Sequence, residues 1–316
     1  MSTYVAKGSR IRILIWAQCL QCVVFIEVYT IQPLLDLELH QIDIKGAYLN
    51  GVLTDDEVIY MRQPPSYIYP NSSSRVLRLR KTIYGLKQSG RRWYQKFTII
   101  CRETMGLTRC NVDQAIFYQK DVDSLVVMAV HVDDCTIAAK PASLVDELKK
   151  KLATRVEVTD LGKLHWLLGM EIAHDRDACV IHLTQGQYIE DIIRRYGCHN
   201  ERPLSLPRGT NVRLSIDQCP KTTEEIAAMW NIPYRRAVGS LMYASLGTCP
   251  DITFAITCLS KYLQNPGPAH WEAVRNVLRY LKATHDHWLV FGKRNGSLTG
   301  WVDADGSQEE DRHAIS

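Results

Sequence analysis

The sequence has few of the features that mark a secreted, zinc-binding or membrane-spanning protein. Its ten cysteines show no pairing order, and the one CxxC, at Cys19 and Cys22, is followed by no second CxxC or His pair at zinc-finger spacing. No cleavable signal peptide is recognisable, so we expect reduced thiols in an intracellular protein. The apolar segment 11–35 contains Arg12, Glu27 and several glutamines, whereas a spanning helix needs about 20 predominantly apolar residues, so we predict no membrane span.

Internal repeats and low-complexity runs are also lacking, and the composition is that of a globular protein. Of the 316 residues, 46% are hydrophobic and 23% charged, which suits one large or two modest domains. The net charge is only +4, but residues 75–96 hold eight Lys or Arg and no acid. Such a concentration of positive charge is typical of a surface for a polyanion.

The most apolar run, Leu125 to Val132, is followed at once by Asp133 and Asp134 and then by a second apolar run. Two apolar runs with acids between them predict a buried β-hairpin with carboxylates at its turn. We expect a helix from Leu144 to Leu152, with Ser143 and Asp146 as a capping box.

Two more helices are expected further along the chain. Apolar residues repeat at helical spacing from Tyr188 to Tyr196 and stop at Gly197. The third helix follows Asn265-Pro-Gly-Pro and has an apolar face and a basic one. The intervening segment 200–220 contains prolines and no periodicity, which indicates a loop. Because the strands come early and the helices late, the predicted fold class is α+β.

The adjacent acids Asp133 and Asp134 allow two interpretations. They repel each other, and burying even one unpaired charge is costly, so a turn that exposes both to water is one explanation. The other is that a divalent cation offsets the repulsion, since Mg²⁺ takes oxygen ligands and uses one or two carboxylates with substrate phosphates. Asp43, between Ile42 and Ile44, would be a third acid, so that two metal ions could promote an in-line displacement at phosphorus.

Seven motifs follow one another in an order typical of one family. They are QIDIKGAYLNG (41–51), IYMRQPPSY (59–67), LRKTIYGLKQSGRRWYQKF (79–97), VHVDDCTIAA (130–139), VTDLGKLHWLLGMEI (158–172), YRRAVGSLMYASLGTCPDI (234–252) and NPGPAHWEAVRNVLRYLKAT (265–284). From about His40 onward the chain resembles the polymerase region of copia-type LTR-retrotransposon polyproteins. His131 stands where Tyr is the commonest residue in relatives.

The resemblance implies a right-hand polymerase fold whose palm carries Asp43 on one strand and Asp133 and Asp134 on a hairpin. All three would be catalytic and would hold two Mg²⁺ ions, with Mn²⁺ as an alternative. Tyr48 falls where such enzymes place an aromatic gate against the ribose 2′-OH. The alternative is that Tyr48 is a tyrosine packed in the palm without such a role. Gln88 would contact the incoming nucleotide.

The resemblance also implies contacts with primer and template. Lys87, Arg91 and Arg92 would meet phosphates, as a polymerase that copies any template requires. Trp93 and its neighbour Tyr94 would stack on bases or ribose, with core packing as the alternative.

The later motifs add further expected contacts with the nucleic acid. The LHWLLGMEI motif looks like a primer grip, with Trp166 and Gly169 near the primer backbone. The basic face of Arg275, Arg279 and Lys282 would follow the duplex, unless it is only a solvated helix face.

The expected domain order is a degenerate or mis-framed fingers segment (1–39), fingers and palm (40–185), a thumb or connection region (186–295) and a truncated start of RNase H (296–316). Val5-Ala-Lys-Gly8 resembles a fingers strand, but residues 9–36 match no segment of the family. Asp303 would be the first RNase H metal ligand; the chain stops at Ser316, so we expect no RNase H activity.

The function predicted from the resemblance is RNA-directed DNA polymerisation. Its partners would be an RNA template, a DNA primer or duplex and dNTPs, with no membrane and an undetermined oligomeric state. The cytoplasm is the expected location, with virus-like particles as an alternative. A non-catalytic remnant that at most binds nucleic acid is the main rival. A two-metal nuclease would also need the three acids as metal ligands, but it does not account for the YGLKQ and LGMEI segments.

Overall fold

The hairpin predicted around Asp133 is present in a computed structural model of the chain, which describes residues 4–5, 36–68, 75–207 and 214–292. Strands β7 (Leu125–His131) and β8 (Asp134–Lys140) pair antiparallel from Leu125–Lys140 to His131–Asp134. Val132 and Asp133 form the two-residue turn between them. The acids therefore lie at the end of a buried hairpin, as predicted.

This hairpin belongs to a six-stranded sheet with the order β5-β6-β7-β8-β2-β9. The other strands are β2 (Glu38–Ile44), β5 (Thr108–Arg109), β6 (Ile116–Lys120) and β9 (Val158–Lys163). β2 pairs antiparallel with both β8 and β9, which puts it in the interior of the sheet. The sheet and its helices form one compact unit within residues 36–164, here called the sheet unit.

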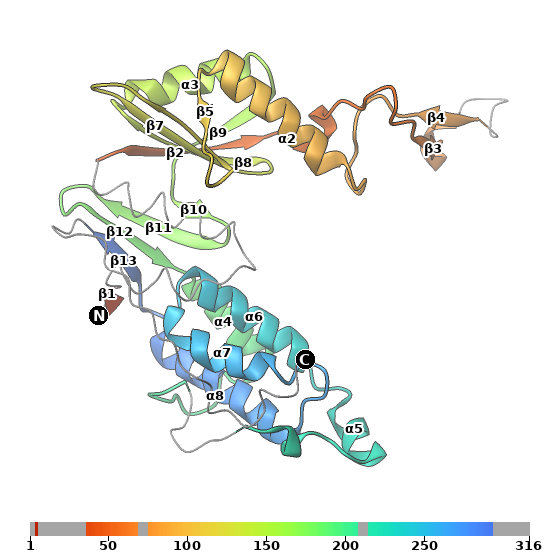
Figure 1. Cartoon of the computed structure of the whole chain (residues 1–316). Helices are drawn as coiled ribbons and strands as arrows, with labels where there is room; N and C mark the ends of the chain where they lie inside the picture. The colour runs from red at the N-terminus through yellow and green to blue at the C-terminus, as the bar shows by residue number, and fades with distance from the viewer. Residues whose placement is uncertain (1–3, 6–35, 69–74, 208–213, 293–316) are drawn as a thin grey trace. The chain divides into compact units, whose positions relative to one another are not determined.

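One face of the sheet is covered by α2 (Ser89–Ile99) and α3 (Ser143–Ala153), as Figure 1 shows. Ile42 and Ile44 of β2 pack there with Trp93 and Phe97 of α2 in one buried cluster. A π-helical turn (Ile100–Thr104) continues α2. Because successive strand residues point to opposite faces, Asp43 projects from the face opposite this core.

The helix predicted at 144–152 is confirmed as α3, but its capping box is wrong. Ala142 occupies the N-cap position, with no side-chain hydrogen bond to the first turn. Ser143 is already the first helical residue, so its hydroxyl is not placed to cap the N–H groups that follow. The remaining elements of the sheet unit are η2 (Ala47–Asn50), η3 (Pro65–Tyr67) and the hairpin of β3 (Tyr60–Arg62) and β4 (Val76–Arg78).

The second compact unit contains residues 4–5 and 165–292 of the described chain and is here called the helix-rich unit. Its five-stranded sheet has the order β1-β13-β12-β11-β10. These strands are β1 (Tyr4–Val5), β10 (Trp166–Leu167), β11 (Met170–Asp175), β12 (Val180–Thr184) and β13 (Leu289–Gly292).

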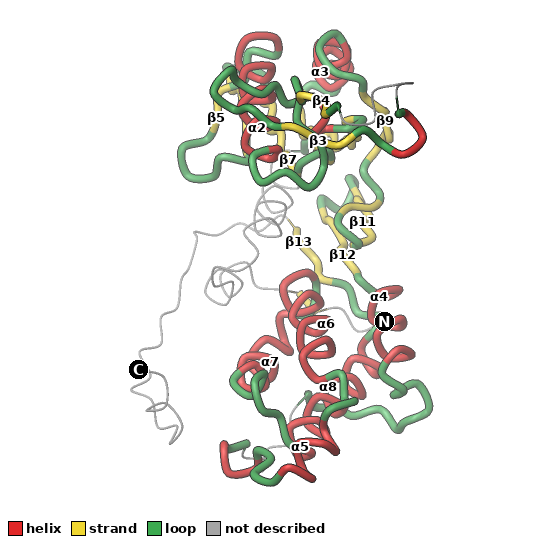
Figure 2. The backbone as a smooth tube through the Cα atoms, turned by 90° about the vertical axis from the view of Figure 1, so that its right-hand side faces the viewer, coloured by secondary structure: helices red, strands yellow, loops and turns green. Residues whose placement is uncertain are grey.

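Figure 2 shows the helices of this unit gathered into a bundle. They are α4 (Gly186–Arg195), α5 (Thr223–Met229), α6 (Tyr234–Gly247), α7 (Thr253–Ser260) and α8 (Pro268–Thr284), with η5 (Ile216–Gln218) and η6 (Pro250–Ile252) between them. Ile189, Leu241 and Leu278 are among the buried side chains that join α4, α6 and α8.

Both helices predicted in this region are confirmed. α4 ends at Arg195, and the stop expected at Gly197 is confirmed, since Gly197 follows the C-cap with a φ of +74°. The N–H of Gly197 donates to Arg194 O and that of Cys198 donates to Ile193 O, which together form a Schellman cap. α8 begins at Pro268, where the missing N–H costs no helical hydrogen bond.

The boundary between the two units lies at Leu164/His165, before the expected division at 185/186. β12 hydrogen-bonds to β13, far along the chain, so β11 and β12 lie in the helix-rich unit. Among the described residues, no helix is both long and apolar enough to cross a membrane. The CxxC cysteines, the apolar segment 11–35 and the segment 296–316 with Asp303 lie outside the described residues.

Candidate functional site

Asp43 and Asp134 are direct partners on the neighbouring antiparallel strands β2 and β8. Directly opposed residues project from the same face of a sheet, with Cβ atoms about 5 Å apart. His131 is the partner of Asp134 on β7, so it projects from this face as well. The tertiary structure thus brings together two carboxylates that are far apart in the sequence.

Asp133 is attached to the same strand end through its backbone. The N–H of Ile44 donates to Asp133 O at 2.9 Å, which ties the turn to the residue after Asp43. Within the turn, Val132 has a φ of +59°, a conformation that a β-branched residue rarely adopts. The indole Nε1 of Trp93 donates to Val132 O at 2.7 Å and so supports this turn from α2.

The two acids of the hairpin turn act electrostatically on Asp43. Burial first, and then the negative charges of Asp133 and Asp134, raise the pKa of Asp43 above its ordinary value, while Lys45 opposes the shift. The pKa of the buried Cys135 thiol is raised chiefly by burial, with the same carboxylates contributing. A concentration of negative charge is therefore present at this end of the hairpin.

The donor set fits a hard divalent cation. Asp43 and Asp133 make no side-chain hydrogen bond or ion pair within the described part of the chain, and Asp134 accepts one from Gln41 Nε2 at 3.2 Å. Over those same residues, no group of three or more His, Cys, Asp or Glu side chains is arranged to hold an ion by itself. Carboxylates that hold Mg²⁺ together with substrate phosphates do not need such a closed arrangement.

Tyr48, expected at the nucleotide, lies in η2 beside α2. Its ring packs partly against the core and has its centroid 5.0 Å from that of Tyr84. Gly90 faces it, since a Cβ added there would lie 3.8 Å from the Tyr48 hydroxyl. Gln88 is the N-cap residue of α2 and is half-buried. Tyr48 and Gln88 therefore both lie at the N-terminus of α2. Lys87 and Arg91 are exposed at the same place.

Two of the residues expected to contact phosphates or bases have partners inside the sheet unit. Arg92 Nε forms an ion pair with Glu57 Oε2 at 2.7 Å, and its Nη2 donates to Thr54 Oγ1 at 2.8 Å. Its charge is therefore neutralised inside the sheet unit. Trp93 is 2% exposed and belongs to the core, so the core-packing alternative holds for it. Tyr94 is half-buried, and its hydroxyl donates to Gln114 O at 2.7 Å.

The expected primer grip is a tight hairpin between β10 and β11. Leu168 and Gly169 form its turn, with φ of +49° and +72°, as in a type I′ turn. The hydroxyl of Tyr243 on α6 donates to Leu168 O and holds the turn against the helix bundle. Trp166, at the start of the hairpin, is 49% exposed and so is open to a ligand.

The basic face of α8 has partners within its own unit, so the duplex contact expected for Arg275 and Arg279 stays a prediction. Arg275 forms an ion pair with Glu201, and Arg279 Nε donates to Arg202 O at 2.8 Å. Lys282 Nζ donates to His199 O at 2.6 Å and Glu201 O at 2.8 Å. These three cations hold the loop after α4, because its acid and carbonyl groups compensate them.

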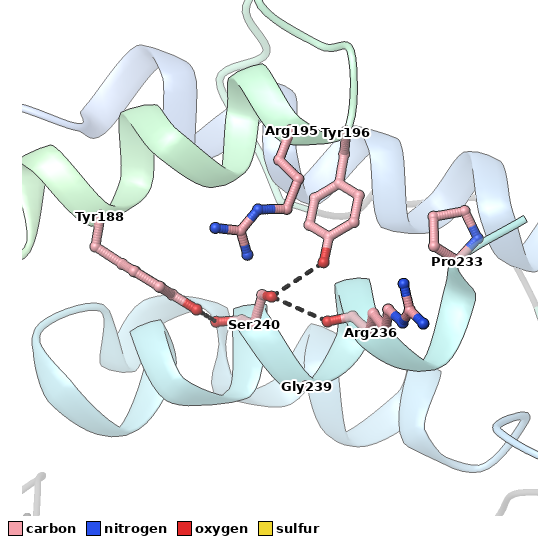
Figure 3. A pocket seen from close by; sticks show the side chains of 7 residues that line it. All are labelled: Tyr188, Arg195, Tyr196, Pro233, Arg236, Gly239 and Ser240. Carbon is pink, nitrogen blue, oxygen red and sulfur yellow. Dashed lines mark hydrogen bonds between the residues drawn. The ribbon is translucent and has the colours of Figure 1, made fainter. Parts of the chain in front are cut away.

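Sequence reasoning missed a pocket between α4 and α6, shown in Figure 3. Its volume is about 630 Å³, and it is lined by Tyr188, Arg195, Tyr196, Pro233, Arg236, Gly239 and Ser240. The hydroxyl of Tyr188 donates to Ser240 O at 3.1 Å. Arg195 and Arg236 are exposed, and neither guanidinium forms an ion pair within the described ranges. The RRYG and YRRAVG sequences hinted at these arginines by charge alone.

Comparison with known proteins identifies the family. A family model described as reverse transcriptase (RNA-dependent DNA polymerase) matches residues 19–209. We expected residues 9–36 to match no part of the family, and this is wrong from residue 19 onward.

Several transposon proteins are similar to the chain. It is 38% identical over 282 residues to the retrovirus-related Pol polyprotein from transposon TNT 1-94 of Nicotiana tabacum, covering 89% of this chain and 21% of that protein. The Pol polyprotein from transposon RE1 of Arabidopsis thaliana is 34% identical over 274 residues, or 86% of this chain and 18% of the relative. A putative transposon Ty5-1 protein of Saccharomyces cerevisiae is 29% identical over 265 residues, 83% of this chain and 82% of its own length.

The chain thus spans about a fifth of the length of the plant Pol polyproteins that it matches. The family model covers more than half of the chain and includes Asp43, Asp133 and Asp134. The protein therefore belongs to the reverse transcriptase (RNA-dependent DNA polymerase) family, in the form found in the Pol polyproteins of copia-type retrotransposons.

Proposed function

We propose that this chain is the polymerase part of a retrotransposon polyprotein and that it extends a DNA primer on an RNA template. The sheet unit would be the palm with part of the fingers, and the helix-rich unit the thumb or connection. The observation that carries the proposal is the register of β2 against β8, which makes Asp43 and Asp134 direct partners beside the turn of Asp133.

In this proposal, Asp43, Asp133 and Asp134 hold the divalent ions. Such ions, when bound, would activate the primer 3′-OH and stabilise the leaving pyrophosphate. The negative charges of Asp133 and Asp134 raise the affinity of Asp43 for positive charge. The Trp93–Val132 hydrogen bond would keep the Asp133 turn in position from the other side of the sheet.

The start of α2 would receive the dNTP. Lys87 and Arg91 are exposed there and make no ion pair with any described residue, so they are suited to neutralise the triphosphate. Gln88 and the partly exposed ring of Tyr48 would lie against the nucleoside. The hairpin with Trp166 and Gly169 would contact the primer strand.

On the helix-rich unit, we propose that Arg195 and Arg236 take the place expected for the α8 arginines. Both line the pocket of Figure 3 without a described carboxylate partner, and the rings of Tyr188 and Tyr196 line the same pocket. Arg neutralises phosphates regardless of base sequence, which a polymerase needs along its duplex.

The test is extension of an oligo(dT) primer on poly(rA) in Mg²⁺ or Mn²⁺. We expect incorporation by the wild type and a loss of at least about 100-fold in Asp133→Asn and Asp43→Asn, since even removing an outer partner of a metal ligand costs about 10–100-fold. Asp123→Asn is the matched control, because Asp123 is an exposed acid at the opposite end of β7.

Equal incorporation by the wild type and Asp133→Asn would remove the carboxylate assignment. If the folded wild type binds poly(rA)·oligo(dT) but incorporates no nucleotide, the chain is a non-catalytic remnant that only binds nucleic acid. Degradation of the template strand without synthesis would favour the nuclease.

A further inference from the structure

The sheet unit also has a concentration of positive charge, on the face of its sheet opposite the carboxylates. A pocket of about 560 Å³ is lined by Val52, Arg92, Gln95, Lys96, Ile99, Ile100, Thr154 and Arg155. It lies where α2 and its π-helical extension meet the residues that follow α3. Asp43 projects from the other face of the sheet, since its neighbours Ile42 and Ile44 pack under α2. The pocket is therefore separate from the proposed catalytic site.

Three cations meet at this pocket. Lys96 and Arg155 line it directly, and Lys81 is held beside it because Lys81 forms an isolated antiparallel bridge with Val52. Arg92 also lines the pocket, but Glu57 already neutralises it. None of the lining residues is acidic.

The three charges are not compensated within the described part of the chain. Neither Lys81, Lys96 nor Arg155 forms an ion pair with a described carboxylate. Partial burial, and then repulsion from Lys81 and Arg155, lowers the pKa of Lys96. A cluster of like charges around a cavity is unfavourable for the isolated protein, and an anion in the cavity would offset the repulsion.

We propose that Lys81, Lys96 and Arg155 form a second nucleic-acid site that binds the phosphodiester backbone of a single strand away from the catalytic carboxylates. A polymer fits better than one small anion, because the exposed Arg78 and Arg80 lead along the chain to Lys81 without an intervening acid. The apolar side chains of Val52, Ile99 and Ile100 add a surface for ribose or base. This proposal does not depend on catalysis.

The experiment measures binding of a fluorescent oligo(rA) by anisotropy over a range of KCl concentrations, in EDTA and without dNTPs. For single strands, the logarithm of affinity falls against the logarithm of salt by about 0.7 per neutralised phosphate. We expect Lys81→Gln/Lys96→Gln/Arg155→Gln to reduce that slope by roughly 2. Arg109→Gln/Lys120→Gln/Lys150→Gln is the charge-matched control, made of exposed cations of the same unit without a described ion pair.

A second measurement shows that the variant is folded. Because the three cations repel one another, their neutralisation should leave the Tm unchanged or raise it, whereas loss of a structural ion pair would lower it. A lower Tm of the pocket variant would overturn the assignment of these cations as a ligand site.

The remaining outcomes also decide the matter. An unchanged salt slope, or equal reductions in pocket and control variants, would overturn the proposal, since the second result reports net charge alone. Stabilisation of the wild type by inorganic phosphate with an unchanged oligo(rA) slope would assign the pocket to a small anion and overturn the nucleic-acid site. Failure of Asp133 to support synthesis would leave this test untouched, because no divalent ion is present in it.

Discussion

Asp43 of β2 and Asp134 of β8 are direct partners across two antiparallel strands, on the face of the sheet that points away from α2 and α3. Cross-strand carboxylates in this arrangement repel each other, and such pairs are normally destabilising. A protein tolerates this arrangement where the charges serve a ligand, which is why the pair is the centre of the proposed active site.

Asp43→Asn should stabilise the protein without divalent ions at neutral pH. The pKa of Asp43 is raised in the folded state, so protonation favours folding at low pH, and that advantage is lost as the pH rises above the ordinary carboxyl pKa of about 4. Asn carries no charge, so its gain in Tm should appear above this pH and disappear below it. Thermal unfolding over a pH series checks this.

The same variant separates ligand from structure. Mg²⁺ should raise the Tm of the wild type and have a smaller effect on Asp43→Asn, because ligand binding to the folded state stabilises it. A variant that is less stable than the wild type at neutral pH would show that Asp43 has a structural role instead.

Trp93→Phe should reduce both stability and primer extension. It keeps most of the core volume but removes the Nε1 donor from the part-buried Val132 O, and the loss of one such hydrogen bond costs about 1 kcal/mol. Urea unfolding measures the first effect, and the ratio of incorporation rates measures the second. Trp230→Phe is the control, because Trp230 is 82% exposed. Equal effects of the two substitutions would show that the Trp93 hydrogen bond does not stabilise the Val132–Asp133 turn.

Gly169→Ala should destabilise the helix-rich unit for two separable reasons. Its φ of +72° disfavours any side chain by about 1–2 kcal/mol, and the added Cβ would lie 2.6 Å from the Tyr243 hydroxyl. Gly162→Ala isolates the first effect, since Gly162 has a φ of +75° with no heavy atom within 4 Å of the added Cβ. In the double variant Gly169→Ala/Tyr243→Phe, the missing hydroxyl should restore the stability lost to the steric contact. If the losses of stability of the two single variants simply add, the contact is contradicted.

Arg279→Gln should lower stability by about 1 kcal/mol and leave the salt dependence of duplex binding unchanged. Arg279 is 21% exposed and donates to Arg202 O, so it serves the loop after α4. Thermal unfolding and anisotropy with an RNA·DNA duplex distinguish the two effects. A reduced salt slope would restore the duplex-binding role that the sequence suggested.

Arg195→Gln/Arg236→Gln should behave in the opposite way. Each lost phosphate contact should reduce the salt slope of duplex binding by about 0.9, with little change in Tm. Both side chains are exposed and lack an ion pair within the described chain. Arg194→Gln is the neighbouring control on α4, and a slope equal to that of the wild type would exclude the pocket of Figure 3 from nucleic-acid binding.

Local signals were sufficient for much of the fold. The hairpin of residues 125–140 and the helices at 143–153, 186–195 and 268–284 follow from periodicity and end signals, which depend on residues close in the sequence. The boundary at 164/165 could not be found in this way, because the β12–β13 pairing joins segments that are far apart in the chain.

The sequence by itself determined the family, because its motifs are local and occur in order, and it supplied the three carboxylates that we propose as metal ligands. Only the tertiary structure decided which neighbours these residues have. Asp43 meets Asp134 through strand register, and Arg92 forms an ion pair with Glu57. The sequence does not reveal whether the charge of an arginine is compensated by a carboxylate of its own chain or by a ligand, because the neighbours of the side chain are set by long-range packing.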